Sequence, residues 1–213
     1  MKKIAVFCAN PDDEVLGMGG TMAKYSAEGS KVLIVVFSYG ESSHPLMKPQ
    51  ITRETRKNES MKAAQLLGCK RLIFLGLKDG FLPKDVHEKG ADKIVQRIVR
   101  FWNPDSIFTH SMDDPLPDHR AVYSTVIRAA EQMKYKGNVF SFDIWNPVNI
   151  MTMRLPKLFV DISHTFSKKI KALGIFKSQK ISMSALLWSV YARDFLNGIR
   201  IRKRFAERFY KVR

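Results

Sequence analysis

Four short runs of hydrophobic residues divide the first half of this chain. They occupy residues 4–9, 32–37, 71–75 and 105–109, and the first two contain no charged residue. Continuous apolar runs of this length are typical of strands that are buried on both faces of a parallel sheet. A loop and then a stretch with helical spacing follow each run. The pattern therefore predicts repeated strand–helix–strand units.

The other stretches predict the remaining elements. We expect helices at about residues 19–29, 53–67, 92–102 and 119–133, a polar loop at 38–52, short strands at 139–142 and 157–160, and mainly helix from residue 163, with a break at Gly198. This order predicts an α/β fold, Rossmann-like, with three αβα layers and a mostly parallel sheet. Such sheets bind ligands beyond the C-terminal ends of their strands, so the polar residues that follow strands are the candidates for chemistry.

Length and composition favour a single domain over residues 1–213, because 213 residues with 45% hydrophobic content suffice for one core. No apolar run approaches the roughly 20 residues that span a bilayer. Cys8 and Cys69 lie in or beside apolar runs, which favours free thiols and a cytoplasmic location. Whether the domain forms a homo-oligomer stays open.

The charge of the chain is strongly positive. Lys and Arg number 36 against 20 Asp and Glu, which gives a net charge of +16. This charge favours anionic partners such as a phosphate-bearing substrate or acidic lipid headgroups. A nucleic-acid partner is not indicated, because the sequence carries no recognised binding motif and no platform of aromatic residues among its basic residues.

The end of the chain, about residues 181–213, combines apolar positions with much of the excess positive charge. We expect a basic helical segment there. Such a segment could lie as a peripheral helix on the anionic inner surface of a membrane. It could equally pack on the domain and expose a solvated face.

Two polar loops carry the candidate chemistry. Asp12, Asp13 and Glu14 follow the first apolar run, where three successive acids repel one another and need a cation or strong hydrogen-bond donors. The loop after the fourth run contains His110 and His119. Carboxylate and imidazole are the ligands of a catalytic zinc site, which keeps one coordination position open. Taken alone, the acids could also cap the helix that follows them.

Several short motifs follow one another along the chain. They are Asn10-Pro11-Asp12-Asp13-Glu14, Gly19-Gly20-Thr21, Ser38-Tyr39-Gly40-Glu41, Pro117-Asp118-His119-Arg120-Ala121-Val122 and Ser178-Gln179. In residue types and order they resemble the PIG-L/LmbE-like N-acetylglucosaminyl deacetylases. The likeness covers roughly residues 3–180 and agrees with the predicted fold.

The resemblance implies a zinc-dependent hydrolase that removes an N-acetyl group from a GlcNAc-containing sugar conjugate or glycolipid. It implies that Asp13, His119 and the residue at position 10, here Asn10, bind the metal, and that Asp12 is the general base. Further polar residues are assigned to substrate binding: Arg56, Glu41, Asp118 and His110. Two of these, the arginine and the glutamate, could instead buttress the site.

Three positions depart from the family pattern. Asn10 stands where the family has a histidine, and a neutral carboxamide oxygen is a poorer zinc ligand than imidazole, so zinc affinity could be reduced or another divalent metal preferred. Leu116 and Phe176 also replace histidines. His110 or Asp113 could complete the metal shell. The alternative function is therefore a catalytically impaired family member that binds a glycan or glycolipid.

Overall fold

The computed structural model describes residues 2–43, 47–144 and 151–213, and for residues 153 and 180–185 it describes the backbone alone. The strands are β1 (Lys3–Cys8), β2 (Lys31–Ser38), β3 (Arg71–Leu77), β4 (Ser106–His110), β5 (Asn138–Phe142), β6 (Lys157–Asp161) and β7 (Ala206–Lys211). The helices are α1 (Asp13–Ala27), α2 (Pro49–Leu67), α3 (Leu82–Glu88), α4 (Ala91–Trp102), α5 (Pro117–Gln132), α6 (Phe166–Leu173) and α7 (Lys180–Arg200). Two short 3₁₀ helices are η1 (Thr152–Arg154) and η2 (Lys177–Gln179).

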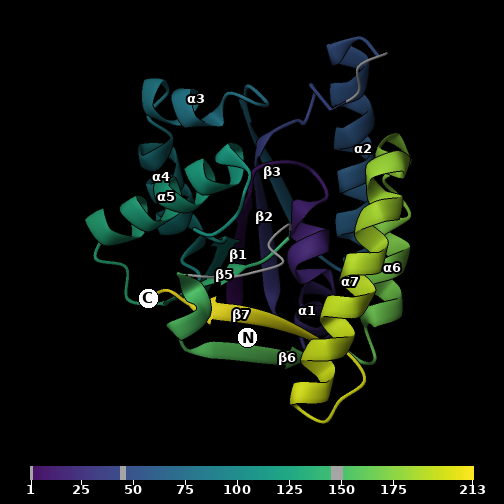
Figure 1. Ribbon diagram of the computed structural model, residues 1–213. Helices are drawn as coiled ribbons and strands as arrows, with labels where there is room; N and C mark the ends of the chain where they lie inside the picture. The colour runs from purple at the N-terminus through teal and green to yellow at the C-terminus, as the bar shows by residue number, and fades with distance from the viewer. Residues whose placement is uncertain (1, 44–46, 145–150) are drawn as a thin grey trace.

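The strands form one sheet in the order β3-β2-β1-β4-β5-β7-β6 (Figure 1). The first five strands of this order are parallel to one another, and β7 lies antiparallel between β5 and β6. The chain builds outward from β1 to β3 in one direction and from β4 to β5 in the other. The order therefore reverses between β1 and β4, the place where doubly wound sheets bind ligands.

Helices cover both faces of the sheet, which confirms the predicted α/β fold with three layers. In Figure 1, α3, α4 and α5 lie on one face, and α1, α2, α6 and α7 lie on the other. Successive side chains of a strand point to opposite faces. Val6 and Ile34 accordingly enter one core, while Phe7 and Val35 enter the other. The continuous apolar runs of β1 and β2 are needed because both of their faces are buried.

The end of the chain corrects the prediction of a basic helical segment over residues 181–213. α7 ends at Arg200, and the chain then turns through Arg202, whose φ is 57°. Gly198 permits this turn, because a Cβ there would lie 2.7 Å from the Arg204 carbonyl oxygen. Residues 206–211 then form β7, whose pairing partners lie far back in the sequence. The helix prediction is confirmed for residues 181–200, which lie in α7, and was wrong for residues 206–211, because local spacing does not show these partners.

Other boundaries also differ from the prediction. α2 begins at Pro49, with proline in its first turn, rather than near residue 53. The sequence predicts no element at α3. α1 begins at Asp13 and is kinked at Met18, where φ is −151° and ψ is 27°. The predicted helix start near Gly19 therefore corresponds to the second half of α1.

A buried ionic cluster, the Lys169 cluster, consists of Lys169, Asp194 and Glu207. Lys169 Nζ lies 2.7 Å from both Asp194 Oδ2 and Glu207 Oε1, and all three side chains are buried. Glu207 also accepts the backbone N–H groups of Gly20 at 3.0 Å and Thr21 at 2.7 Å. A kink leaves N–H groups like these without acceptors inside the helix, and the carboxylate caps them. The cluster thereby ties α1 to α6, α7 and β7.

Candidate active site

Three side chains that can bind a metal meet where β1 and β4 end. Asp13 is the first residue of α1, after the short loop that follows β1. His110 is the last residue of β4, and His119 lies in the first turn of α5. β1 and β4 are adjacent and parallel, so their C-terminal ends lie at the same edge of the sheet. Topology therefore brings together residues that are far apart in the sequence.

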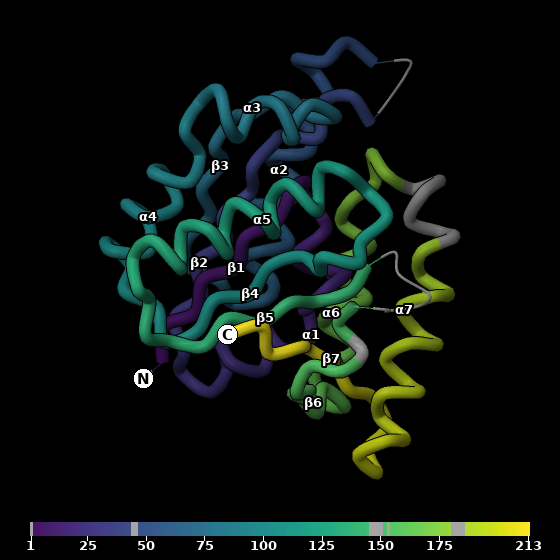
Figure 2. The backbone as a smooth tube through the Cα atoms, turned by 60° about the vertical axis from the view of Figure 1, so that its left-hand side comes forward, coloured from purple at the N-terminus to yellow at the C-terminus, as the bar shows by residue number. Residues whose placement is uncertain are grey.

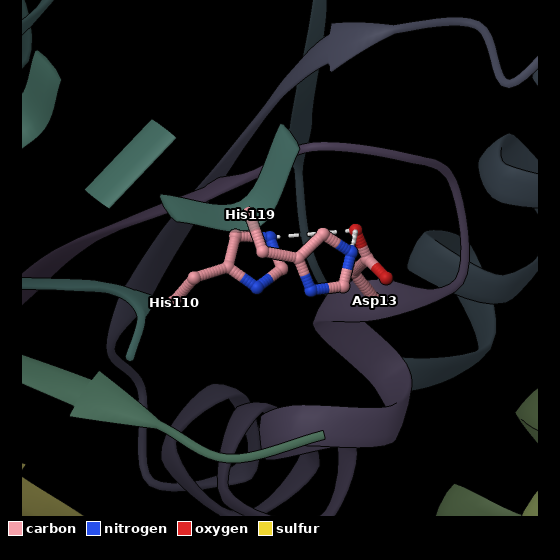
Figure 3. A group of neighbouring side chains, drawn as sticks. All are labelled: Asp13, His110 and His119. Carbon is pink, nitrogen blue, oxygen red and sulfur yellow. Dashed lines mark ion pairs between the residues drawn. The ribbon is translucent and has the colours of Figure 1, made fainter. Parts of the chain in front are cut away.

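The three side chains face one another closely (Figure 3). Asp13 Oδ2 lies 3.4 Å from His110 Nε2 and 3.5 Å from His119 Nε2. The two imidazole rings stack with their centroids 3.9 Å apart, and one donor atom from each residue lies within 4.8 Å of the other two. Ligand atoms of a tetrahedral zinc site with bonds of about 2.1 Å are separated by about 3.4 Å. The cluster therefore forms a possible Asp/His/His metal site.

The two imidazoles are held in different ways. His119 Nδ1 lies 3.0 Å from Asp114 Oδ2, and such a carboxylate fixes the ring orientation of a metal-binding histidine. His110 Nε2 accepts the Ala9 N–H at 2.9 Å. A cation at His110 Nε2 would have to displace this N–H. His119 is therefore oriented for a ligand role, whereas His110 would exchange one partner for another.

Burial and mutual contact shift the pKa values of these groups. Burial acts to raise the pKa of Asp13, but His119, His110 and the Asn10 N–H outweigh it and hold this pKa at about 2. Burial lowers the pKa of His110, and the neighbouring His119 lowers it further. In His119 burial also acts to lower the pKa, but Asp13 and Asp114 raise it overall. Asp13 is therefore ionised, which is the form that binds cations.

Asp12, the predicted general base, lies beside the cluster in a strained backbone conformation. Its φ is 96°, in a region that residues other than glycine rarely adopt and that persists where surrounding contacts enforce it. Arg56 Nη2 donates to Asp12 Oδ2 at 3.1 Å, and the Asp12 N–H donates to Glu14 Oε2 at 3.2 Å. Burial raises the pKa of Asp12 to about 7, although Arg56 acts to lower it. A general base works best when its pKa is near the working pH.

Arg56 joins two loops of the site. Its side chain is buried, and it donates through Nη2 to the Pro11 carbonyl oxygen and through Nη1 to the Gly40 carbonyl oxygen at 3.3 Å. Gly40 has a φ of 66°, and a Cβ at this position would collide with the guanidinium group. These contacts favour the alternative in which Arg56 buttresses the site over the one in which it binds the sugar.

Asn10 contacts Asp13 through its backbone and other loops through its side chain. The Asn10 N–H donates to Asp13 Oδ2 at 2.7 Å. The carboxamide hydrogen-bonds with Ser38 Oγ, and with its nitrogen turned toward Asp79 it donates to Oδ1 at 3.1 Å. Because the carboxamide already hydrogen-bonds with Ser38 at the end of β2 and with Asp79 in the loop after β3, its role as a metal ligand stays a prediction.

Asp113 and His110 were the other positions considered for the metal shell, and the structure places them in different surroundings. Asp113 Oδ2 accepts hydrogen bonds from the backbone N–H and from the Oγ1 hydroxyl of Thr152, each at 2.8 Å, and does not join the cluster. His110, predicted to bind substrate or to complete the metal shell, lies within 4.8 Å of Asp13 and His119 and is fully buried, and its role stays a prediction. Of the two other departures from the family pattern, Leu116 is exposed at the start of α5, and Phe176 is part of a hydrophobic core.

Asp118 and Glu41, both predicted to bind substrate, hold the loop after β3. Asp118 accepts the N–H of Gly80 at 2.8 Å through Oδ2 and that of Leu82 at 3.2 Å through Oδ1. Glu41 Oε1 accepts the N–H of Asp79 at 3.2 Å. Both carboxylates therefore fix the loop that carries Asp79, and their contact with a substrate stays a prediction.

Two buried acids of the site received no role from the sequence. Asp79 faces Asn10, and burial raises its pKa. It lies two residues after the end of β3, so the rule applied to the ends of the other strands would have found it. Asp114 orients His119, but in the sequence nothing distinguishes it from Asp113 beside it. Only the packing of α5 against β4 separates these two neighbours.

Comparisons with known proteins match this arrangement to a family of enzymes. The family model described as GlcNAc-PI de-N-acetylase (PIG-L) matches residues 5–130. The chain is 30% identical over 189 residues to probable N-acetyl-alpha-D-glucosaminyl L-malate deacetylase 2 of Bacillus cereus, a match that covers 85% of this chain and 86% of that protein. It is 27% identical over 212 residues to 4-oxalmesaconate hydratase of Pseudomonas putida, covering 90% and 78% respectively.

A solved structure agrees with the family at the level of the fold. N,N'-diacetylchitobiose deacetylase from Pyrococcus horikoshii, in complex with an inhibitor, superposes with a TM-score of 0.85 at 22% identity. The superposition covers 99% of this chain and 84% of that chain. Motif order, site geometry and family match thus lead to one assignment: the chain is an enzyme of the PIG-L (GlcNAc-PI de-N-acetylase) family.

Proposed function

We propose that this protein is a zinc-dependent N-deacetylase that acts on a GlcNAc-containing conjugate. The observation that carries the proposal is the convergence of Asp13, His110 and His119 next to Asp12, where the strand order reverses. Family membership and the deacetylase from Bacillus cereus support hydrolysis of an N-acetyl group as the reaction.

Asp13, His119 and His110 would hold the metal. One carboxylate and two imidazoles are a ligand set that catalytic zinc sites use, and harder divalent ions accept it as well. Bound zinc would supply a Lewis acid for the amide carbonyl and lower the pKa of water. Asp114 would keep the His119 ring in its orientation during turnover.

Asp12 would move the proton. Arg56 occupies its Oδ2 at 3.1 Å, which leaves Oδ1 to take a proton from the attacking water. The same carboxyl group would then give this proton to the nitrogen of the leaving amine. Arg56 supports this role indirectly, because its contacts with the loops after β1 and β2 keep Asp12 in its strained backbone conformation.

The substrate would be an amino-sugar conjugate whose second part is anionic or lipid-linked. A net charge of +16 favours an anionic conjugate over a neutral one. The family name, GlcNAc-PI de-N-acetylase, and the GlcNAc-malate conjugate in the name of the relative from Bacillus cereus agree with such a substrate. Glu41 and Asp118 would shape the wall that the sugar contacts.

A second candidate is a catalytically impaired protein that binds a glycan without cleaving it. Two residues favour it. Asn10 uses its carboxamide in hydrogen bonds to neighbouring loops, and Leu116 places no hydrogen-bond donor at the start of α5. The first of these could weaken the metal site, and the second removes a group that could stabilise an oxyanion.

Metal analysis and acetate release together test the proposal. After purification without added metal, we expect about one zinc ion per chain. We also expect acetate release from GlcNAc-malate or N,N'-diacetylchitobiose, and its loss in Asp12→Asn, which keeps all proposed ligands. A zinc-loaded wild type that binds these conjugates without releasing acetate would establish the second candidate instead. Hydration of 4-oxalmesaconate without deacetylation would overturn both.

A further inference from the structure

α7 exposes an apolar face to solvent. Leu186 and Val190 on its inward side are buried in the core, as are the polar residues Asp194 and Asn197. On the opposite side five large hydrophobic residues are exposed, here called the α7 outer face: Trp188 (80%), Tyr191 (44%), Phe195 (48%), Leu196 (56%) and Ile199 (55%). At about 100° per residue they lie within an arc of about 140°, along about 16 Å of helix.

The charged residues of this part of α7 turn away from its outer face. Between residues 188 and 199 only Arg193 and Asp194 are charged. Arg193 Nη2 donates to the Leu16 carbonyl oxygen at 2.7 Å, and Asp194 belongs to the Lys169 cluster. A surface helix ordinarily presents polar residues to solvent. A contiguous apolar face of this size marks an interaction site.

A group of exposed cations, here called the basic end, continues the α7 outer face at its C-terminal end. It consists of Arg200, Arg202, Lys203 and Arg204. The single ion pair that the described residues contribute to it joins Lys203 Nζ to Asp161 Oδ2 at 3.7 Å, between two partly exposed side chains. The basic end is therefore largely uncompensated. Aromatic and aliphatic side chains next to such cations are typical of helices that lie on anionic membranes.

The position of α7 leaves this face accessible. α7 runs along the outside of the molecule, and its C-terminal end projects beyond the sheet in both views (Figures 1 and 2). Just before its other end, Gln179 Nε2 donates to Ser43 Oγ at 2.9 Å, in the loop that carries Glu41. No helix in the described part of the chain is long and apolar enough to cross a bilayer.

We propose that the α7 outer face and the basic end dock this protein on the surface of a bilayer that contains anionic lipid. The five hydrophobic side chains enter the headgroup region, and the four cations contact lipid phosphates. A second copy of the chain is the other occupant that such a face could accept. The net charge of +16 opposes self-association and favours an anionic surface. The inference does not depend on which reaction the active site performs.

Co-sedimentation of the full chain with lipid vesicles tests this inference. We expect binding to vesicles of equal parts phosphatidylcholine and phosphatidylglycerol, little binding to phosphatidylcholine alone, and weaker binding as salt rises. Trp188→Gln and Leu196→Gln should each weaken binding about tenfold, because each removes a side chain that becomes buried on docking. The matched control is Phe101→Gln, since Phe101 is 76% exposed on α4 and should leave binding unchanged.

Two double variants test whether binding depends on the cations of the basic end or only on the net charge of the protein. Arg200→Gln with Arg204→Gln should weaken binding about 25-fold, since each cation near an anionic surface contributes about a factor of five. Lys62→Gln with Lys93→Gln removes the same charge from exposed positions of α2 and α4 and should leave binding nearly unchanged. Thermal melts and acetate release from a soluble conjugate should not change in any of these variants.

Two results would overturn the proposal. One is equal sedimentation of the wild type and all the variants with anionic vesicles. The other is no sedimentation of the wild type with these vesicles. In that case, a dimer in analytical ultracentrifugation that Trp188→Gln dissociates would identify the α7 outer face as an interface between two copies of the chain.

Discussion

Two clusters of buried charged side chains in this protein follow different rules. In the Lys169 cluster each charge has a partner, because Lys169 Nζ lies 2.7 Å from two carboxylates and Glu207 also accepts two backbone N–H groups. In the active site, His110 and His119 direct their Nε2 atoms at one oxygen of Asp13 from 3.4 and 3.5 Å. These separations are longer than good hydrogen bonds and close to those between ligands of one metal ion.

The difference separates a structural role from a chemical one. A buried cluster whose charges satisfy one another contributes to the fold, and breaking it leaves an uncompensated buried charge. In the cluster around Asp13 the donor atoms lie at ligand separations, and two of them, His110 Nε2 and Asp13 Oδ2, accept backbone N–H groups that a metal ion could displace. Changing this cluster should affect binding or catalysis first. Substitutions in the Lys169 cluster should therefore reduce stability with little effect on chemistry, and substitutions around Asp13 should do the reverse.

The largest effect is expected from Asp12→Asn. The variant keeps the proposed metal ligands, and asparagine tolerates the positive φ of this position. Loss of a general base should lower kcat about 10²- to 10⁴-fold. Steady-state kinetics of the zinc-loaded variant would measure this, with metal content and melting temperature as controls. An activity within tenfold of the wild type would show that Asp12 is not the base.

Lys169→Met should have the next largest effect, and on stability. It leaves Glu207 buried without its cation, while Asp194 keeps Arg193 Nε at 3.3 Å from its Oδ1. Removing one partner of a buried ion pair costs about 3–5 kcal/mol in comparable cases. Urea unfolding would measure the loss. Lys168→Met, an exposed neighbour on α6, is the matched control and should change the free energy of unfolding by less than about 0.5 kcal/mol. Zinc bound per folded chain should stay the same, and a loss of zinc would show that the two clusters are coupled.

The same two clusters show how far the sequence alone predicts this protein. The parallel strands are predictable because burial on both faces demands continuous apolar runs, as in β1 and β2. β7 is not, because Glu207 and Arg208 interrupt its apolar positions. The burial of Glu207 depends on Lys169, on another element. From the sequence alone, a strand of this kind is indistinguishable from an exposed polar segment, because the side chain that pairs with its buried acid lies on another element.

The residues of the candidate site likewise fall into those that the sequence predicts and those whose place depends on the topology. Asp12, Asp13 and His119 stand in motifs that are visible in the sequence. The place of His110 beside Asp13 depends on the pairing of β1 with β4, which no local spacing shows. The buttressing contacts of Arg56 likewise depend on where the loops after β1 and β2 meet. Residue types predict the chemistry of the site, and only the topology shows which of them share it.

Asp114→Asn should have a moderate effect on the metal. Asp114 lies 3.0 Å from His119 Nδ1 and fixes that ring, and loss of such a partner typically weakens metal affinity about 10- to 100-fold. Competition with a chromogenic zinc chelator would measure the change. Asp113→Asn is a matched control, because the adjacent carboxylate contacts Thr152 instead and should leave zinc affinity unchanged. Equal affinities in both variants would remove Asp114 from the site.

The smallest effect is expected from Asn10→His, which restores the residue that the family pattern has at this position. If Asp13, His110 and His119 already form a complete set, another imidazole should change zinc affinity by less than about tenfold, or about 1.4 kcal/mol. The substitution also removes the carboxamide that hydrogen-bonds with Ser38 and Asp79. His110→Ala should then abolish tight zinc binding in both backgrounds. A hundredfold gain from Asn10→His, with His110→Ala neutral, would instead make position 10 the third ligand position and favour a protein that has lost its metal chemistry.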